Sequence, residues 1–476
     1  MRPADYIVTA NTDSEVEMRW TTWKTLAAVA IMVAPLMNCA DQPATAVAPD
    51  ANRHAPPAPT NVLTPDSVRR LASGRAIFPL ESPRYIRPSL VKLGQALAFD
   101  KILSGNRDIA CTTCHLPAFS TGDDRSLSIG QSGIGFGPHR TIQSGVFIAR
   151  NAPPLFDIGA MRHLFLDGRV QIMHGRVNTP AGRDLTPRMQ RVLEFGPASA
   201  IAMFPVENRD EMRGYSQNDL GRLADDDNTA IWATLMKRIG EVPEYRRMFE
   251  QAYPGQRFER MTFAHAANAI GAFMVDKLTF SNTPWDRFLE GRDNALTPAQ
   301  LAGAQTFLVL KCSICHNGAT LSDDKFHDVA VAQIGPGKGN GASLRDDFGR
   351  ENISNDESDR YLFRTSPLRN VELTAPYGHD GAYSTLQSFV EHYSNSDTKL
   401  LAFDPSALDP SLQGTFMPNA ADILAQRDTL LKGVVLTDSI VTNLMNYMSA
   451  LTDDRARNLN SLVPNHVPSG LPVDHP

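Results

Sequence analysis

The stretch Cys111-Thr112-Thr113-Cys114-His115 decides the architecture expected of this chain. Two thiols at positions i and i+3 can each add to one vinyl group of a haem. The histidine that follows them can then bind the iron from the proximal side. This is the pattern of covalent c-type haem attachment. It occurs a second time, at Cys312-Ser313-Ile314-Cys315-His316.

A single motif of this kind could instead be a redox-active dithiol or half of a zinc site. Two copies, each with histidine in the fifth place, argue against both alternatives. A zinc site would need the two cysteine pairs close together, and here they lie about two hundred residues apart in the sequence. We therefore predict two covalently bound haem c groups in two domains, held by Cys111, Cys114 and His115 and by Cys312, Cys315 and His316.

The composition is that of a globular protein, with 42% hydrophobic and 21% charged residues among 476. This length suffices for two or three domains. The formal net charge of −6 gives no electrostatic reason to expect nucleic acid or an anionic membrane as a partner. Four of the five cysteines lie in the two motifs, so none of these four is expected to form a structural disulfide.

The N-terminus carries the features of an export signal. Arg19 and Lys24 precede an apolar run from Leu26 to Met37, which is too short to span a membrane. We predict a signal over residues 1–39 and a periplasmic location, which agrees with haem attachment outside the cytoplasm. Cys39 is a candidate for a lipid anchor, although Asn38 is larger than the residue expected before it.

The rest of the chain is expected to be mainly α-helical, because no alternating strand pattern of any length occurs. Residues 40–84 are rich in proline and alanine and are predicted to be a linker. We predict helices over residues 90–99, 261–276, from Thr297 toward the second motif, and over 438–451. Two cytochrome c-like domains are expected at 85–280 and 281–455, with a polar, proline-containing tail at 456–476.

Residues 88–455 resemble the bacterial di-haem cytochrome c peroxidases, the family that contains MauG. Beyond the two haem motifs, the resemblance rests on the following segments: Ser128-Ile129-Gly130, Arg150-Asn151-Ala152-Pro153, Asp167-Gly168-Arg169, Pro205 with Glu211-Met212, and residues 368–377. It implies that peroxide reacts at the N-terminal haem, that the C-terminal haem is six-coordinate and handles electrons, and that a calcium ion lies between the domains.

For the first haem, the resemblance implies His115 as the proximal ligand and Glu211, six residues after Pro205, as the acid–base group. Peroxidases of the family often carry a capping histidine where this chain has Gln131. An amide is a poor iron ligand, so we predict an open, five-coordinate iron. His139 remains an alternative ligand, and Glu207 is a competitor of Glu211. Ile201 replaces the distal glutamine of the family, and Leu166 replaces a tryptophan that lies between the haems.

For the second haem, spacing alone leaves several candidates for the ligand opposite His316: Tyr377, His379, Tyr383, His392, Tyr393 and Met417. The resemblance favours Tyr393, because the peroxidases place a methionine at this position and MauG-like proteins place a tyrosine there. A phenolate stabilises the higher oxidation states of iron, whereas a methionine raises the potential. Met417 remains the main alternative.

The resemblance also implies a calcium site formed by Asn151, Thr374 and Pro376, whose oxygen donors suit a hard cation. The preferred function is a MauG-like or MbnH-like oxidoreductase that uses hydrogen peroxide to oxidise a secreted protein partner, typically at tryptophan. One alternative is a conventional peroxidase that takes electrons from a small cytochrome or cupredoxin. Another is an electron-transfer cytochrome without enzymatic activity. Tyr393 argues against the first alternative, and Glu211 with an open haem argues against the second.

Overall fold

In a computed structural model of the chain, residues 63–143 and 146–475 are described. The predicted export signal, Cys39 and most of the predicted linker lie outside these residues. Across the described ranges, no helix combines the length and the apolar character needed to cross a lipid bilayer.

The described chain is mainly α-helical, as predicted, with a few short strands. Its α-helices are α1 (Pro65–Gly74), α2 (Pro88–Phe99), α3 (Cys111–Cys114), α4 (Pro187–Gln190), α5 (Pro197–Ala200), α6 (Asn228–Gly240), α7 (Pro243–Ala252), α8 (Phe263–Lys277), α9 (Pro284–Leu289), α10 (Pro298–Val309), α11 (Cys312–Cys315), α12 (Glu351–Ser354), α13 (Leu386–His392), α14 (Ser396–Leu401), α15 (Pro410–Gln413), α16 (Ala420–Gln426) and α17 (Asp438–Ala450). The strands β1 (His163–Leu164), β2 (Val170–Met173) and β3 (Arg176–Asn178) form an antiparallel sheet, and β4 (Phe326–His327) pairs antiparallel with β5 (Phe363–Arg364).

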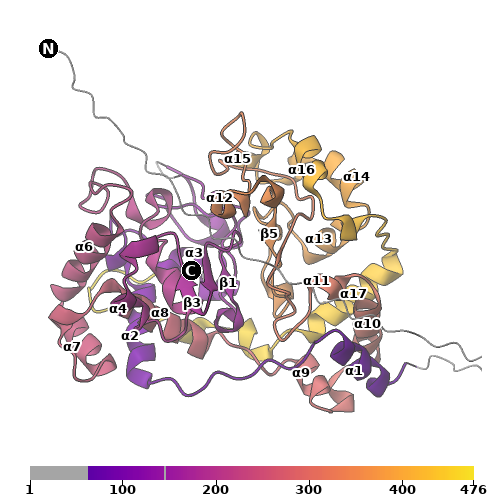
Figure 1. The fold of residues 1–476 in the computed structure, drawn as a ribbon, viewed down its shortest axis with the longest axis horizontal. Helices are drawn as coiled ribbons and strands as arrows, with labels where there is room; N and C mark the ends of the chain where they lie inside the picture. The colour runs from indigo at the N-terminus through magenta and orange to yellow at the C-terminus, as the bar shows by residue number, and fades with distance from the viewer. Residues whose placement is uncertain (1–62, 144–145, 476) are drawn as a thin grey trace, which may run out of the picture. The chain divides into compact units, whose positions relative to one another are not determined.

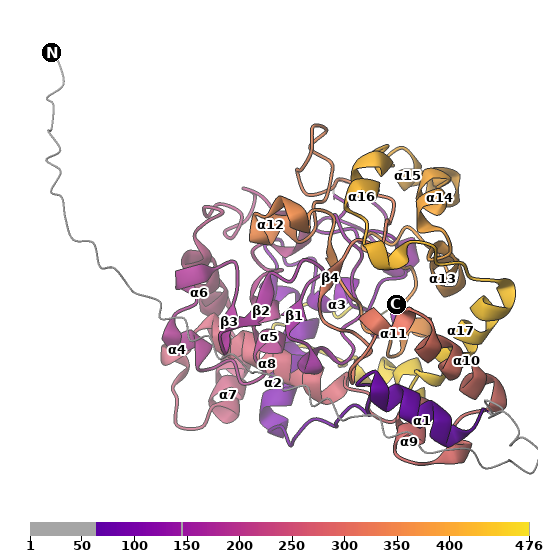
Figure 2. The ribbon, with the colours of Figure 1, turned by 45° about the vertical axis from the view of Figure 1, so that its right-hand side comes forward.

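Each haem motif follows a helix that packs closely against a second, longer helix. In the first half of the chain, α2 precedes the motif helix α3 and lies against α8 (Figures 1 and 2). Gly94 makes this close approach possible, because a Cβ atom at this position would lie 1.8 Å from the carbonyl oxygen of Ala269. The packing of α2 on α8 therefore fixes the helix that precedes the first motif.

The second half of the chain repeats this arrangement. Helix α10 precedes the motif helix α11 and packs on α17. A glycine again allows the close approach: at Gly303 of α10, a Cβ atom would lie 2.2 Å from the carbonyl oxygen of Asn443. The predicted capping box starts α10: Thr297 accepts from the amide of Gln300 at 3.2 Å, and Gln300 accepts from the amide of Thr297 at 3.0 Å.

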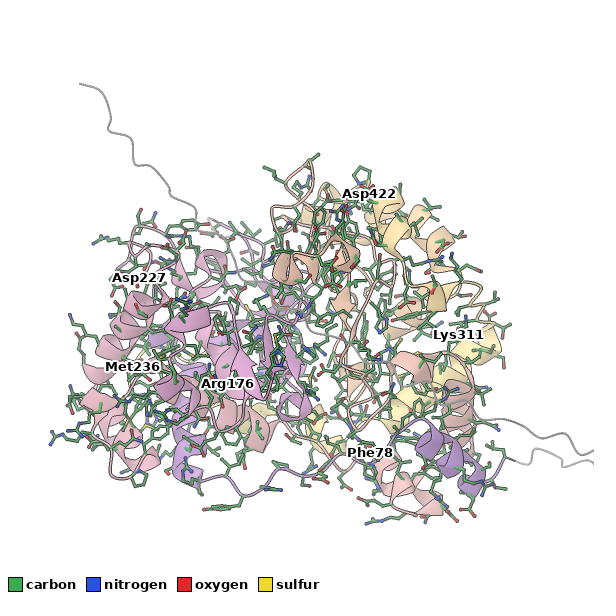
Figure 3. All side chains as sticks on the ribbon, in the orientation of Figure 1. Phe78, Arg176, Asp227, Met236, Lys311 and Asp422 are labelled. Carbon is green, nitrogen blue, oxygen red and sulfur yellow. The ribbon has the colours of Figure 1, made fainter. Side chains whose placement is uncertain are left out.

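Two large clusters of buried apolar side chains form the core. Figure 3 draws the side chains on the ribbon. The first draws its buried members from residues 86–280 and 456–467, and the second from residues 68–77 and 285–451. The boundary between them lies near the predicted domain boundary at 280. That the two halves are separate haem domains stays a prediction.

The expected linker and tail have structure where the chain is described. Helix α1 begins after the N-cap Thr64 and buries Val68 and Ala72 in the second cluster, which is why this part of residues 40–84 is helical. Residues 456–475 pack against the first half of the chain. Asp474 forms an ion pair with Lys101 at 2.5 Å and accepts a hydrogen bond from Thr113 at 2.5 Å. Specific polar contacts thus hold a segment whose composition predicted a tail.

A buried ion pair ties α9 to the segment before residue 370. The Arg369 guanidinium donates to both carboxylate oxygens of Asp286, at 2.7 and 2.6 Å, and both side chains are only 1% exposed. Asp286→Asn would leave a buried guanidinium without its counter-ion, so we expect a loss of about 3 kcal/mol or more in the free energy of unfolding. Denaturant unfolding of the haem-loaded protein measures this loss.

The matched control is Asp293→Asn, which breaks a largely exposed pair with Arg69. Exposed pairs contribute little, so this variant should differ from the wild type by less than about 1 kcal/mol. Equal unfolding midpoints for Asp286→Asn and Asp293→Asn would contradict the assignment of a structural role to the buried pair.

Candidate haem sites

The first motif presents its histidine in one defined orientation. Helix α3 ends at Cys114, and the Nδ1 atom of His115 lies 2.9 Å from the carbonyl oxygen of Thr121. A carbonyl oxygen only accepts, so Nδ1 carries the proton and Nε2 keeps its lone pair. Burial lowers the pKa of His115, which favours this neutral form. The ring is thus oriented as a metal-ligating imidazole is, with the second nitrogen held by a backbone acceptor.

The second motif repeats the same geometry on α11. The Nδ1 atom of His316 lies 3.1 Å from the carbonyl oxygen of Leu321, and burial lowers the pKa of this imidazole as well. None of the four motif cysteines forms a disulfide. Within the described residues, Cys315 lies with Asp323 and His327 in a group of three that could hold a metal ion, but neither cysteine pair belongs to a four-ligand cluster of the kind that a structural zinc site requires. The arrangement therefore agrees with two haem attachment sites.

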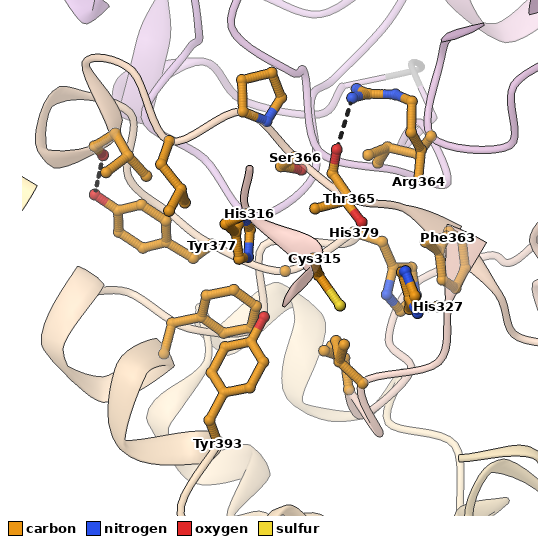
Figure 4. A pocket seen from close by; sticks show the side chains of 18 of the residues that line it. Cys315, His316, His327, Phe363, Arg364, Thr365, Ser366, Tyr377, His379 and Tyr393 are labelled. Atoms are coloured by element: carbon orange, nitrogen blue, oxygen red, sulfur yellow. Dashed lines mark hydrogen bonds between the residues drawn. The ribbon is translucent and has the colours of Figure 1, made fainter. Parts of the chain in front are cut away.

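A cavity of about 470 Å³ opens beside the second motif. Its lining includes Cys312, Cys315, His316 and Tyr393 (Figure 4). Much of the remaining lining is apolar and comes from α10, α13 and α17, including Phe307, Leu386, Phe389, Val390, Leu444 and Met448. Thiols, a neutral imidazole and an apolar wall in one cavity fit a covalently held haem.

Tyr393 is the candidate sixth ligand whose hydroxyl remains free in this cavity. Figure 4 shows its ring extending from the end of α13 toward Cys315 and His316. Burial raises the pKa of Tyr393. Within the described residues its hydroxyl has no hydrogen-bond partner, whereas the hydroxyl of Tyr377 donates to the carbonyl oxygen of Val371 at 2.8 Å.

Four of the other candidates, Tyr377, Tyr383, His392 and Met417, are engaged elsewhere or do not line the cavity, whereas His379 lines it. His392 uses both ring nitrogens, one with the Tyr383 hydroxyl at 2.7 Å and one with the carbonyl of Val329 at 2.7 Å. Met417 is buried, but it does not line the cavity. His379 does line it, and its ring stacks on Phe363 with centroids 4.0 Å apart.

Glu211 lies in a single turn of π-helix, Arg209–Arg213, a form that is frequent at functional sites. Asn208 begins this turn: its side-chain oxygen accepts from the amide of Glu211 at 3.2 Å, and its Nδ2 donates to Glu211 Oε1 at 3.1 Å. Burial raises the pKa of the carboxyl. Pro205 lies just upstream, and its carbonyl oxygen accepts from the amide of Asn208 at 3.3 Å.

The competing carboxyl, Glu207, is also largely buried, and burial raises its pKa to about 8. Its Oε1 has no partner within the described residues. The two acids therefore differ in their partners: Asn208 contacts Glu211 twice, whereas Glu207 lies near Trp232 and Arg213.

Gln131 is buried next to the Glu211 turn. Its Nε2 donates to the carbonyl oxygen of Met212, and its own amide donates to that of Asp210 at 3.2 Å. The side chain is thus tied to the backbone beside Glu211. His139, the alternative ligand, is exposed on the surface of the same loop. The neighbouring Arg140 donates to the carbonyls of Ile129, Gly130 and Gly135 and holds this loop together.

The residues expected to bind calcium line one cavity. Asn151, Thr374 and Pro376 all line the cavity of the second motif. Asn151 donates through Nδ2 to the carbonyls of Arg125 and Ser126, at 2.8 and 3.2 Å, so its Oδ1 is the atom available to a cation. A carboxamide oxygen and nearby carbonyls are ligands that suit calcium.

The family model for di-haem cytochrome c peroxidases matches residues 88–294, the part that contains the first motif, Gln131 and Glu211. Over these residues the chain is similar to the di-haem cytochrome c peroxidases. It is accordingly an oxidoreductase.

Relatives of the chain include both conventional peroxidases and MauG-type proteins. The cytochrome c551 peroxidase of Pseudomonas aeruginosa is 29% identical over 306 residues, which are 64% of this chain and 71% of that protein. The methylamine utilization protein MauG of Methylorubrum extorquens is 25% identical over 318 residues, covering 66% and 71%. A solved MauG-like protein associated with microbial copper homeostasis has the same fold, with a TM-score of 0.54 and 23% identity over 79% of this chain and 94% of that chain.

The two residues predicted to depart from the family pattern line the cavity. Leu166, in place of the inter-haem tryptophan, and Ile201, in place of the distal glutamine, belong to its lining. Trp232 and Trp285 are buried in the two apolar clusters and do not line it. Among the described residues, no tryptophan takes the place of the missing one.

Three charged residues that line the cavity, His327, Arg364 and Lys311, carry no sequence signal. His327 lies between Asp428, at 2.6 Å, and Asp323, at 3.1 Å. The hydrogen bond with Asp323, together with the nearby Cys315 sulfur, raises the pKa of His327 to about 11. Arg364 also lines the cavity. Lys311, labelled in Figure 3, donates to carbonyl oxygens at the cavity's edge, those of Leu430 and Lys432.

Proposed function

We propose that the protein is a periplasmic di-haem peroxidase that uses hydrogen peroxide to oxidise a residue of a secreted protein partner, with tryptophan as the expected target. The observation that carries this proposal is Tyr393, which reaches the second haem cavity with a free hydroxyl. A phenolate ligand favours the higher oxidation states of iron. Such a site suits an enzyme that stores oxidising power for a difficult substrate.

The haem at the first site would be held by Cys111, Cys114 and His115, and that at the second by Cys312, Cys315, His316 and Tyr393. When bound, the haems supply the redox chemistry of the reaction with peroxide. Glu211 would take a proton from one peroxide oxygen and deliver it to the other. Its Oε1 accepts from Asn208, so Oε2 is the atom that would carry this proton.

Asn151, Thr374 and Pro376 would hold one calcium ion through the Asn151 Oδ1 and backbone carbonyls. All three line the cavity that also contains Leu166 and Tyr393. A cation there would fix the segments that surround both the second haem and the position of the missing tryptophan.

A conventional peroxidase that takes electrons from a small cytochrome or cupredoxin is the second candidate, because the relatives include the cytochrome c551 peroxidase. The two functions are separated with the purified two-haem protein and peroxide. In one assay, a reduced small c-type cytochrome is the electron donor. In the other, a small secreted protein encoded beside the gene is examined by mass spectrometry for peroxide-dependent oxidation at tryptophan. Fast cytochrome oxidation without tryptophan modification would overturn the preferred function.

The position of Gln131 leads to a prediction for the resting protein. The ferric holoprotein should contain one high-spin and one low-spin haem without reductive activation, because the Gln131 amide is a poor ligand and is tied to the Met212 carbonyl. Electron paramagnetic resonance distinguishes the two states. Gln131→His offers the matched variant, in which the high-spin signal should decrease. Two low-spin signals in the wild type would contradict the prediction.

A further inference from the structure

Buried arginines in this protein usually have a carboxylate partner. Six arginine residues are less than 9% exposed in the described chain: Arg140, Arg150, Arg213, Arg238, Arg364 and Arg369. Four of them form ion pairs with aspartate: Arg150, Arg213, Arg238 and Arg369. Arg140 instead donates to three backbone carbonyls. Arg364, like Arg140, has no carboxylate within 4.0 Å among the described residues, and it has only two side-chain acceptors, the carbonyls of Phe165 and Thr365.

Arg364 is held in place from two sides. On β5, its backbone amide donates to the carbonyl of Leu166 at 2.8 Å, and its Nε donates to the carbonyl of Phe165 at 3.3 Å. Its Nη1 donates to the carbonyl of Thr365 at 2.9 Å. These contacts fix the guanidinium at the wall of the cavity, where Figure 4 shows it above Thr365 and Ser366.

A buried cation without a counter-ion is costly, since desolvation is not offset by an ion pair. Burial lowers the pKa of Arg364 to about 10 in the protein alone. An arginine always stays charged at neutral pH, so a fixed guanidinium at a cavity wall indicates that the occupant of the cavity is an anion. A planar guanidinium fits a carboxylate best, through two parallel hydrogen bonds.

We propose that Arg364 binds a propionate carboxylate of the haem held by Cys312, Cys315 and His316. This inference rests on the proposed haem in the cavity. Arg364 also donates to the carbonyls of Phe165 and Leu166. It would therefore link the second haem to the segment where the resemblance places the inter-haem tryptophan of the family. Arg364 is a positioning residue. Its positive charge stabilises the reduced form of the iron and so raises the potential of the haem, although by less than a change of iron ligand would.

The test is the midpoint potential of the second haem, measured by spectroelectrochemistry on the purified two-haem protein. Arg364→Gln removes the cation from a propionate, so we expect a lower potential, by roughly a tenfold change in the one-electron reduction equilibrium, or about 59 mV. Arg364→Lys keeps the charge and should recover part of the shift. The ligand-sensitive bands of the second haem should not change in either variant.

The matched control is Arg350→Gln. Arg350 donates to the carbonyls of Asp167 and Gly168, close to the same segment, but it does not line the cavity. Arg350→Gln should therefore leave the midpoint potential of the second haem unchanged. The propionate bending modes in the resonance Raman spectrum give a second readout, which should shift between wild type and Arg364→Lys.

The outcomes are distinct. A potential in Arg364→Gln equal to that of wild type and Arg350→Gln, or propionate modes that do not respond to Arg364→Lys, overturns the proposal while leaving the haem site intact. A wild-type protein with a single haem, bound at Cys111 and Cys114, overturns the proposed function itself. A lower potential confined to Arg364→Gln, with partial recovery by lysine, supports the contact.

Discussion

Replacing Glu211 by glutamine should slow the reaction with hydrogen peroxide by about a hundredfold or more, the usual contribution of a well-placed acid–base group. Glutamine preserves the shape of the side chain and can still accept from Asn208, but it cannot take the peroxide proton. Stopped-flow mixing of the ferric protein with peroxide measures this rate. The ferric spectra should not change, because Glu211 is not an iron ligand.

The pH dependence gives the same prediction a second readout. Burial raises the pKa of Glu211 above its ordinary value of 4.5. The carboxylate form is the base, so the rate should rise with pH through this elevated pKa, and the rise should be absent in Glu211→Gln. A pH profile that survives the substitution would move the proton transfer to another group.

Glu207→Gln is the matched control, since this carboxyl is buried four residues away and has a raised pKa of about 8. It lacks the Asn208 contact that holds Glu211. We expect its rate to stay within about twofold of wild type, as for substitutions away from a catalytic group. A large loss in Glu207→Gln with a normal rate in Glu211→Gln would reverse the assignment.

The sequence predicted those parts of the fold that depend on local patterns. Residues 90–99, 261–276 and 438–451 were expected to be helical, and the structure has α2, α8 and α17 over nearly these ranges. Capping residues and apolar spacing are local signals, which is why Thr297 marked the start of α10. The close approaches at Gly94 and Gly303 carry no such signal, because the partner backbone comes from a distant helix.

The last twenty residues show where composition misleads. Their polar, proline-containing sequence predicts a tail, yet Val467 is buried and Asp474 bonds with Lys101 and Thr113. A few specific contacts hold this segment, and pattern analysis does not detect them. The contact with Thr113 places the segment directly behind the first haem motif.

The candidate sites also contain residues that sequence spacing identifies and residues that only the structure reveals. Spacing identified His115 and His316, but the carbonyls of Thr121 and Leu321 that orient them are backbone atoms, which leave no trace in the sequence. Spacing also left Tyr393 among six candidates, and the cavity lining narrows that set. No sequence motif marks Arg364. What draws attention to it is that no carboxylate lies within 4.0 Å in the described chain, and only the structure can show this.

Tyr393→Met should convert a histidine–tyrosinate site at the second haem into a histidine–methionine site and raise its potential strongly. A neutral thioether favours the ferrous state, whereas a phenolate favours higher oxidation states. Potentiometry and the near-infrared charge-transfer band of a methionine-ligated haem measure the change. Met417→Leu is the control, and it should leave the spectrum unchanged because Met417 does not line the cavity.

The same variant tests the link between the ligand and the proposed function. With the higher potential, oxidation of the protein partner should be lost, while turnover with a reduced small cytochrome should increase. An unchanged spectrum in Tyr393→Met, with a changed one in Met417→Leu, would show that Met417 is the ligand. A changed spectrum with partner oxidation intact would show that Tyr393 binds the iron but does not set the function. The binding of Tyr393 to the iron and its effect on oxidation of the protein partner are thus tested separately, because the phenolate can set the potential of the haem only if it is bound.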